Sequence, residues 1–182
     1  MKAYLDIETS FGGEITVIGL YAPDRGLVQL VGGGISDRVR WVFGFIGFLG
    51  FKLNKPNRPN RLNKRRALEG IQVICTYNGS RFDLPVIRRR LGLDLCAAFT
   101  SHDLMYDCWR RRLYGGLKRV EERLGISRRT RGIDGVDAMR LWHRYETSRD
   151  REALATLLEY NREDVLNLEC LDRMLRGSVA CA

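Results

Sequence analysis

The sequence has few of the residues from which zinc sites and disulfides are built. It contains two histidines, and its five cysteines are scattered with no Cys-x-x-Cys pair; they are Cys75, Cys96, Cys108, Cys170 and Cys181. A structural zinc site is therefore not expected. An odd number of scattered cysteines instead predicts reduced thiols, as in cytosolic proteins.

Long apolar segments are also absent. The longest uncharged apolar run, Trp41 to Phe51, has 11 residues, whereas a membrane span needs about 20. The opening sequence, MKAYLDIETS, places charges where a signal peptide has its apolar centre. We therefore expect a cytoplasmic protein with no membrane partner.

Acidic residues are missing from one basic stretch, residues 52–66. It carries seven of the 31 basic residues, and without it the chain has 24 basic and 22 acidic residues, so it accounts for most of the net charge of +9. Its proline and asparagine content predicts an exposed, low-complexity insertion. The segment is either an arm that contacts a polyanion or a solvated loop. Shorter basic runs at 88–90, 110–112 and 128–131 are expected on solvated faces, some of them in contact with phosphates.

The rest of the chain predicts a single α/β domain over residues 1–182, with strands first and helices last. Runs rich in β-branched and aromatic residues predict strands at Ala3–Ile7, Ile15–Ala22, Leu27–Val31 and Ile71–Thr76, and a fifth ending at His102 and Asp103. Helical patterns occur at Asp37–Phe51, Asp83–Leu91, Leu117–Leu124, Asp134–Tyr145 and Asp150–Leu175. This order predicts a mixed sheet of about five strands with helices packed on its faces.

Acidic residues in three separate segments are candidates for a shared site. Asp6 and Glu8 are two apart on the first strand, so their side chains project from the same face. Asp83 follows a buried strand and a turn, and Asp164 lies four residues after Tyr160 on the last helix. Taken singly, these patterns also fit a surface strand, a helix N-cap and a half-buried tyrosine beside a solvated aspartate.

Four carboxylates converge only where something offsets their repulsion. Mg²⁺ and Mn²⁺ prefer oxygen ligands, and two such ions about 3.5–4 Å apart can clamp the attacking and leaving oxygens of a phosphodiester. Glu163 is the nearest competitor of Asp164 but lies about 100° around the helix. We expect Glu163 at the surface, among polar neighbours.

The three segments resemble the motifs of the DEDD superfamily of 3′–5′ exonucleases. Residues Asp6–Thr9 are similar to the first motif, and Tyr77–Asp83 are similar to the second in the form found in family-B DNA polymerases. Residues Tyr160–Asp164 resemble the third motif of the tyrosine subtype, YxxxD, whereas the histidine subtype would need His at the position of Glu159. The likeness runs from Leu5 to about Leu175 and implies a ribonuclease H-like fold.

Uncharacterised prokaryotic ribonuclease H-like domains related to those polymerases share further patterns with this chain. These are His102-Asp103-Leu104 and a Gly-Leu-Lys…Leu-Gly-Ile pattern that begins at Gly116. In those domains the third motif often reads His-Asn-x-x-Asp, so Tyr160 occupies a histidine position. Residues 32–66 depart from the likeness, so the resemblance does not indicate the local path of the chain or the shape of the substrate groove.

The resemblance implies a metal-dependent exonuclease that hydrolyses phosphodiester bonds. Asp6, Glu8, Asp83 and Asp164 would bind two divalent cations, Mg²⁺ or Mn²⁺, with Asp6 bridging both. Tyr160 would orient the attacking water through its hydroxyl group.

Nucleic acid is the partner that such a site implies, with single-stranded 3′ ends of DNA favoured, as in DNA repair. Substrate contacts are expected from Asn78 and Thr9 in the motifs, and from Lys64, Arg65 and Arg66 at the end of the basic segment. Two alternatives remain open: a nucleic-acid-binding domain with weak catalysis, and a structure-specific endonuclease on the same metal centre.

Overall fold

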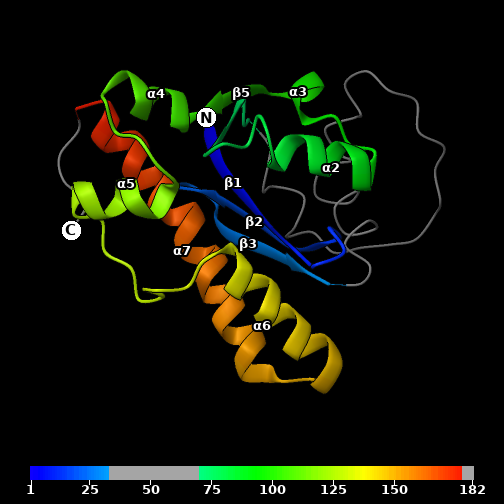
Figure 1. Cartoon of the computed structure of the whole chain (residues 1–182). Coiled ribbons are helices and arrows are strands. Elements are labelled where there is room, and N and C mark those ends of the chain that lie inside the picture. Colours follow the sequence, from blue (N-terminus) through cyan, green and yellow to red (C-terminus); the bar gives the residue numbers. More distant parts are fainter. Residues whose placement is uncertain (33–69, 178–182) are drawn as a thin grey trace.

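The computed structural model describes residues 1–32 and 70–177 of the chain (Figure 1). The helix expected at Asp37–Phe51 and the basic segment 52–66 lie outside the described residues. Within the two described ranges, no helix combines the length and the apolarity that a membrane crossing requires.

The described strands form one mixed sheet. In spatial order they are β3 (Gly26–Val31), β2 (Ile15–Ala22), β1 (Lys2–Thr9), β4 (Val73–Thr76) and β5 (Thr100–Asp103). Strands β1, β2 and β3 pair antiparallel, whereas β4 pairs parallel with both β1 and β5. The prediction of a mixed sheet of about five strands is confirmed.

The described helices lie mainly in the later part of the chain. They are α2 (Asp83–Leu91), α3 (Leu95–Ala98), α4 (Leu104–Arg110), α5 (Leu117–Leu124), α6 (Gly135–Ser148) and α7 (Arg151–Leu175). The last two begin one residue later than predicted because Asp134 and Asp150 are N-caps whose carboxylates accept hydrogen bonds from first-turn amides. Helix α3 was not predicted, since a segment so short shows no clear apolar period.

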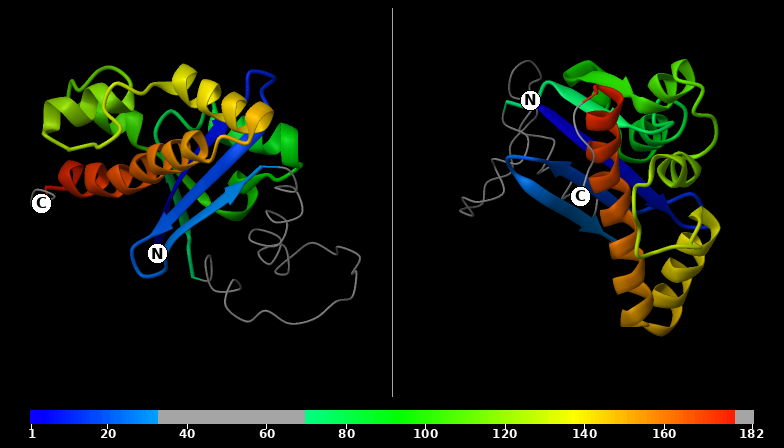
Figure 2. Two further views of the ribbon diagram at one scale, coloured as in Figure 1. Left: turned by 90° about the horizontal axis from the view of Figure 1, so that it is seen from below. Right: turned by 90° about the vertical axis from the view of Figure 1, so that its left-hand side faces the viewer.

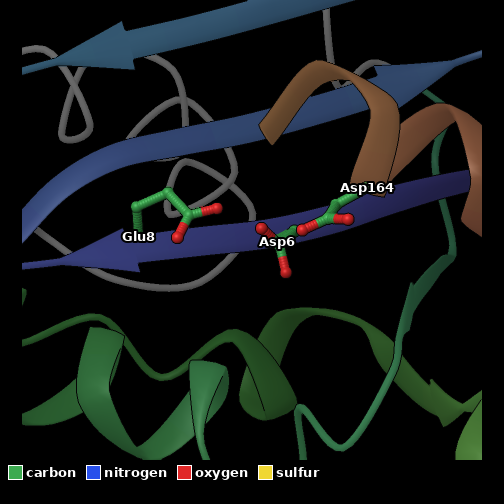
Figure 3. Close-up of side chains that lie close together, drawn as sticks. All are labelled: Asp6, Glu8 and Asp164. Atoms are coloured by element: carbon green, nitrogen blue, oxygen red, sulfur yellow. The ribbon is translucent and has the colours of Figure 1, made fainter. Parts of the chain in front are cut away.

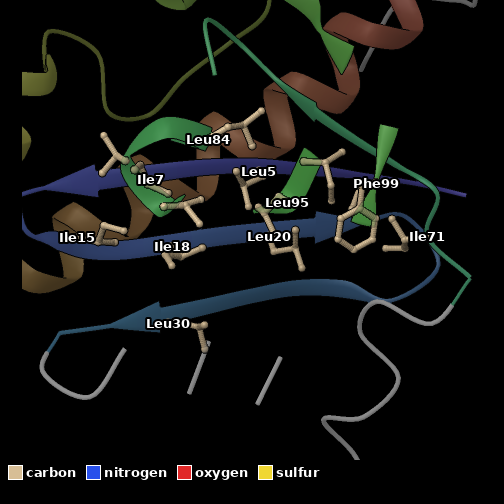
Figure 4. Packing of buried hydrophobic residues seen from close by; sticks show 14 of the residues in the cluster. Leu5, Ile7, Ile15, Ile18, Leu20, Leu30, Ile71, Leu84, Leu95 and Phe99 are labelled. Carbon is tan, nitrogen blue, oxygen red and sulfur yellow. The ribbon is translucent and has the colours of Figure 1, made fainter. Parts of the chain in front are cut away.

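Different helices cover the two faces of the sheet. On β1, Leu5 and Ile7 face a core that α2 and α3 close (Figure 4). On the opposite face, Tyr4 packs in a cluster with α4, α5 and α7, and α6 lies beside α7 (Figure 2). Because side chains alternate along a strand, Asp6 and Glu8 lie on the face that α7 crosses.

The cysteines differ in part from expectation. Cys75, Cys96 and Cys108 have free thiols, whereas Cys170 is disulfide-bonded. The prediction of reduced thiols is therefore wrong at Cys170, because spacing along a chain does not show which sulfur atoms the fold brings within bonding distance.

Candidate active site

Three carboxylates from β1 and α7 meet on one face of the sheet. Asp6, Glu8 and Asp164 each offer one carboxylate oxygen, and these three oxygens lie within 4.8 Å of one another (Figure 3). Asp6 and Glu8 share this face because they are two apart on one strand, and Asp164 reaches them from α7. The structure thus brings together three of the four acids singled out in the sequence.

The close approach of α7 to β1 depends on Gly19 of β2. Gly19 is the cross-strand partner of Asp6, and a Cβ atom at Gly19 would lie 2.3 Å from Asn161 Oδ1. Asn161 donates a hydrogen bond from Nδ2 to Asp6 Oδ2 at 3.0 Å, and its Oδ1 accepts one from Gln29 Nε2 at 3.0 Å. Asn161 therefore fixes the direction of the Asp6 carboxylate, a role that the sequence did not indicate.

Asp83 lies beside this group and is held by the backbone of β1. Its Oδ1 accepts a hydrogen bond from the Ile7 amide at 3.0 Å. Strand β4 pairs with β1 only as far as Tyr4. The Ile7 amide therefore lies beyond this pairing and donates to the Asp83 side chain of α2 instead. The N-cap alternative is wrong for Asp83, because Phe82 occupies that position and Asp83 is the first helical residue.

Two cations are paired with Asp164. Lys118 Nζ, in the first turn of α5, lies 3.0 Å from Asp164 Oδ2, and Arg128 Nη1 lies 2.6 Å from Asp164 Oδ1. The Arg128 side chain is only 6% exposed and is also paired with Glu121 at 2.8 Å. A buried charge is costly unless it is paired, so Glu121 holds Arg128 in place against Asp164. The expectation of a solvated face at 128–131 is therefore wrong for Arg128.

Glu163, which was expected at the surface, is buried. Its carboxylate accepts hydrogen bonds from the amides of Arg129 and Thr130, at 2.6 and 3.0 Å, and from the Thr130 hydroxyl. Although burial raises the pKa of Glu163, these hydrogen bonds outweigh it and hold the pKa below its usual range. The expectation was wrong because the connection between α5 and α6 covers this part of α7, which the polarity of neighbouring residues does not reveal.

Tyr160 is buried beside the carboxylates, and the ammonium group of Lys118 lies 4.1 Å from the centre of its ring. Burial, followed by the charges of Asp164 and Glu8, raises the pKa of the Tyr160 hydroxyl far above its usual range. The hydroxyl therefore stays protonated and can donate a hydrogen bond. Lys118 was not predicted as a site residue, although the Gly-Leu-Lys pattern was a signal for it.

Burial and mutual repulsion raise the pKa values of the acids. For both Asp6 and Glu8, burial is the largest cause of the rise and the charge of Asp164 is the next. The pKa of Asp6 lies well above its usual value, and the pKa of Glu8 is about 8. Burial also raises the pKa of Asp83 to about 7, although the hydrogen bond from Ile7 lowers it.

The donor set fits a divalent cation. Glu8 Oε1 is buried and has no hydrogen-bond partner among the described residues. A divalent cation would supply that partner and offset the repulsion between Asp6, Glu8 and Asp164, and a set of carboxylate oxygens suits Mg²⁺ or Mn²⁺.

Other expected substrate contacts lie near this group or outside the described residues. Asn78 is in the left-handed region, with φ of 60°, and its amide donates to Asp103 Oδ1 at 2.7 Å. Thr9 is the last residue of β1, directly after an irregularity in its pairing with β2. Three basic residues lie in the part of the chain that is not described: Lys64, Arg65 and Arg66.

The fold resembles that of a much larger protein. No curated protein matches the sequence. Among solved structures, the family B DNA polymerase from the hyperthermophilic archaeon Pyrobaculum calidifontis is similar, with a TM-score of 0.62 and 19% sequence identity. The match covers 97% of this chain and 25% of the polymerase chain, so the chain spans about a quarter of that protein. The family model of the RNase_H superfamily matches residues 3–176, a range that includes the four acids, and the chain belongs to that superfamily.

Proposed function

We propose that the chain is a metal-dependent 3′–5′ exonuclease. The observation that carries the proposal is the group formed by Asp6, Glu8 and Asp164, whose oxygens lie within 4.8 Å of one another. Membership of the RNase_H superfamily makes nucleic acid the first substrate to test. The 3′ polarity rests on the resemblance of the three motifs to the DEDD exonucleases, with Tyr160 in the position of the tyrosine subtype.

The acids would hold two divalent cations. Asp6, Glu8 and Asp164 supply oxygens from two elements, and Asp83 lies close enough for its charge to raise the pKa values of Asp6 and Glu8. When bound, such cations lower the pKa of a water molecule and stabilise the departing 3′-oxygen of the phosphodiester.

The chain's own residues would orient the reactants. The protonated Tyr160 hydroxyl directs the attacking water by a hydrogen bond, and Asn161 keeps Asp6 in place. Lys118 and Arg128, paired with Asp164, reduce the negative charge that an approaching phosphate meets. In the proposed reaction, the water oxygen forms the new bond to phosphorus while the bond from phosphorus to the 3′-oxygen breaks, and the proton that the water loses is balanced by the one that the departing 3′-oxygen gains.

A cavity lies beside the two cations that are paired with Asp164. This cavity of about 560 Å³ lies between α5 and the connection to α6, and Lys118, Arg128 and Arg131 are in its wall. We propose further substrate contacts from Asn78 and Thr9. The same proposal extends to the basic segment that contains Lys64, Arg65 and Arg66.

A nuclease assay with end-labelled single-stranded DNA, duplex DNA and RNA tests the proposal. We expect stepwise loss of nucleotides from the 3′ end with Mg²⁺ or Mn²⁺, and none with excess chelator. Asp6→Asn should lower turnover by orders of magnitude without loss of the fold, because it removes a charge from a repulsive group. Glu146→Gln, at an exposed acid of α6, is the matched control and should be fully active.

The two alternatives give different results in the same assay. Cleavage of a circular single strand would identify an endonuclease, because an exonuclease needs an end. Binding of nucleic acid without hydrolysis at any metal concentration would identify a binding domain. Activity that persists in excess chelator would contradict the metal assignment.

A further inference from the structure

Two aromatic rings and an arginine meet on the surface of α4. The Tyr106 and Trp109 rings pack edge to face, with centroids 5.5 Å apart and an interplanar angle of 87°. The guanidinium carbon of Arg81 lies 5.9 Å from the centre of the Trp109 ring. Tyr106 is 36% exposed, and neither ring belongs to the described core clusters. These rings therefore form a surface feature that core packing does not account for.

Asp103 ties this surface to the second motif. Its carboxylate accepts hydrogen bonds from the Asn78 amide at 2.7 Å, and from the amide and hydroxyl of Ser80 at 3.1 and 2.6 Å. It also caps α4 through the Met105 amide at 3.1 Å. Helix α4 is thus fixed to the segment that leads into Asp83, and the Asp103 charge raises the pKa of Asp83. Figure 1 shows α4 beside β5 at one end of the sheet.

An exposed cation adjoins the rings. Arg81 is exposed on one side of Trp109, whereas of the arginines that follow Trp109 in the sequence, Arg111 donates to the Leu175 carbonyl. The acid on this helix, Asp107, is paired with Arg110 and with His102. Proteins that hold single strands combine exposed aromatic rings, on which bases stack, with cations that contact the phosphates.

We propose that the α4 aromatic surface (Arg81, Tyr106 and Trp109) binds unpaired bases of a single-stranded nucleic acid. A base stacks on the exposed Tyr106 ring, which Trp109 supports edge to face, and Arg81 contacts the adjoining phosphate. A duplex does not fit this role because its base faces are covered by stacking. The inference rests on the proposed function and deepens it, since the surface would hold the strand whose end reaches the carboxylates.

Binding measured in excess chelator tests the surface without turnover. The probes are a fluorescent single-stranded adenine oligonucleotide and an abasic oligonucleotide of the same length. Tyr106→Leu should weaken binding of the adenine oligonucleotide by roughly 5- to 150-fold, the range for one lost stacking contact. It should leave binding of the abasic oligonucleotide unchanged, and Tyr106→Phe, which keeps the ring, should bind as the wild type does.

A matched control uses a second arginine–aromatic pair. At the C-terminal end of α6, the Cζ atom of the C-cap residue Arg149 lies 5.9 Å from the Tyr145 ring centre, the same separation as in the Arg81–Trp109 pair. Arg81→Ala should weaken binding of both oligonucleotides, since both carry phosphates, whereas Arg149→Ala should affect neither.

The outcomes separate this inference from the proposed function. Equal affinity of the wild type for both probes, or an equal effect of Tyr106→Leu on both, would overturn the stacking surface even if metal-dependent 3′ cleavage is observed. A ring-dependent preference for the adenine probe, with no cleavage in Mg²⁺ or Mn²⁺, would uphold the surface and overturn the exonuclease.

Discussion

Replacing Glu8 with Gln should stabilise the metal-free protein, and increasingly so as the pH rises. The Glu8 side chain is buried near Asp6 and Asp164, and its pKa is raised from 4.5 to about 8. A rise of this size corresponds to about 5 kcal/mol between the folded and unfolded states. Glutamine has the same shape and does not ionise, so Glu8→Gln removes this cost.

The sign follows from proton binding. The folded protein binds the Glu8 proton more tightly than the unfolded chain, so this contribution is fully present below about pH 4.5 and is lost as the pH rises through about 8. The difference in free energy of unfolding between Glu8→Gln and the wild type should therefore be small near pH 4.5. By the same linkage it should grow to about 3 kcal/mol at pH 7 and about 5 kcal/mol at pH 9.

Urea unfolding in excess chelator, at several pH values, measures this difference. Glu146→Gln changes an exposed acid on α6 and controls for a general effect of net charge. Added Mn²⁺ at pH 8 should stabilise the wild type by about 3 kcal/mol at one hundred times its dissociation constant, and Glu8→Gln much less. A difference between Glu8→Gln and wild type that stays constant from about pH 5 to pH 9 would refute the reasoning.

Substitutions at four positions test the surroundings of the acids. Asp83→Asn keeps an acceptor for the Ile7 amide and should retain stability while losing metal-dependent rate, whereas Asp83→Ala leaves that buried amide unpaired and should cost about 1–3 kcal/mol in urea unfolding. Tyr160→Phe should lower the rate about 10²–10⁴-fold with unchanged Mn²⁺ binding by calorimetry. An unchanged rate would show that Tyr160 has only a structural role in the core. Gly19→Ala should destabilise the protein by about 1–3 kcal/mol, because its Cβ would lie 2.3 Å from Asn161 Oδ1. Adding Asn161→Ala should restore stability but not activity, and a Gly19→Ala protein with normal stability and activity would contradict this account.

Sequence patterns predicted the parts of the site that depend on local periodicity. Asp6 and Glu8 share a face because strand side chains alternate, and Leu5 and Ile7 fill the opposite core. Helix α7 was predicted from its apolar period, which places Asp164 on the face toward the sheet. Such patterns repeat within one element, so they can be detected without knowledge of the fold.

One partner of these acids, Arg128, could not be predicted, because it comes from a segment without a periodic pattern. Arg128 lies in the connection between α5 and α6, and only the folded chain brings it to Asp164 and Glu121. The two neighbours of Arg128 in the sequence do not pair with these acids in the same way. Arg129 is exposed, and the Ser127 carbonyl accepts a hydrogen bond from Asn167. An arginine run therefore does not indicate which of its members becomes buried.

The hydrogen bonds around each buried acid separate structural carboxylates from those suited to a metal. Asp103 and Glu163 are both buried, and backbone amides and hydroxyls donate to both oxygens of Asp103 and both of Glu163. Glu8 is equally buried, yet its Oε1 has no donor among the described residues. An unsatisfied buried carboxylate oxygen is costly, and a fold retains it where a ligand compensates. The sequence shows three acids of similar surroundings, and only the arrangement of donors in space distinguishes Glu8 from the other two.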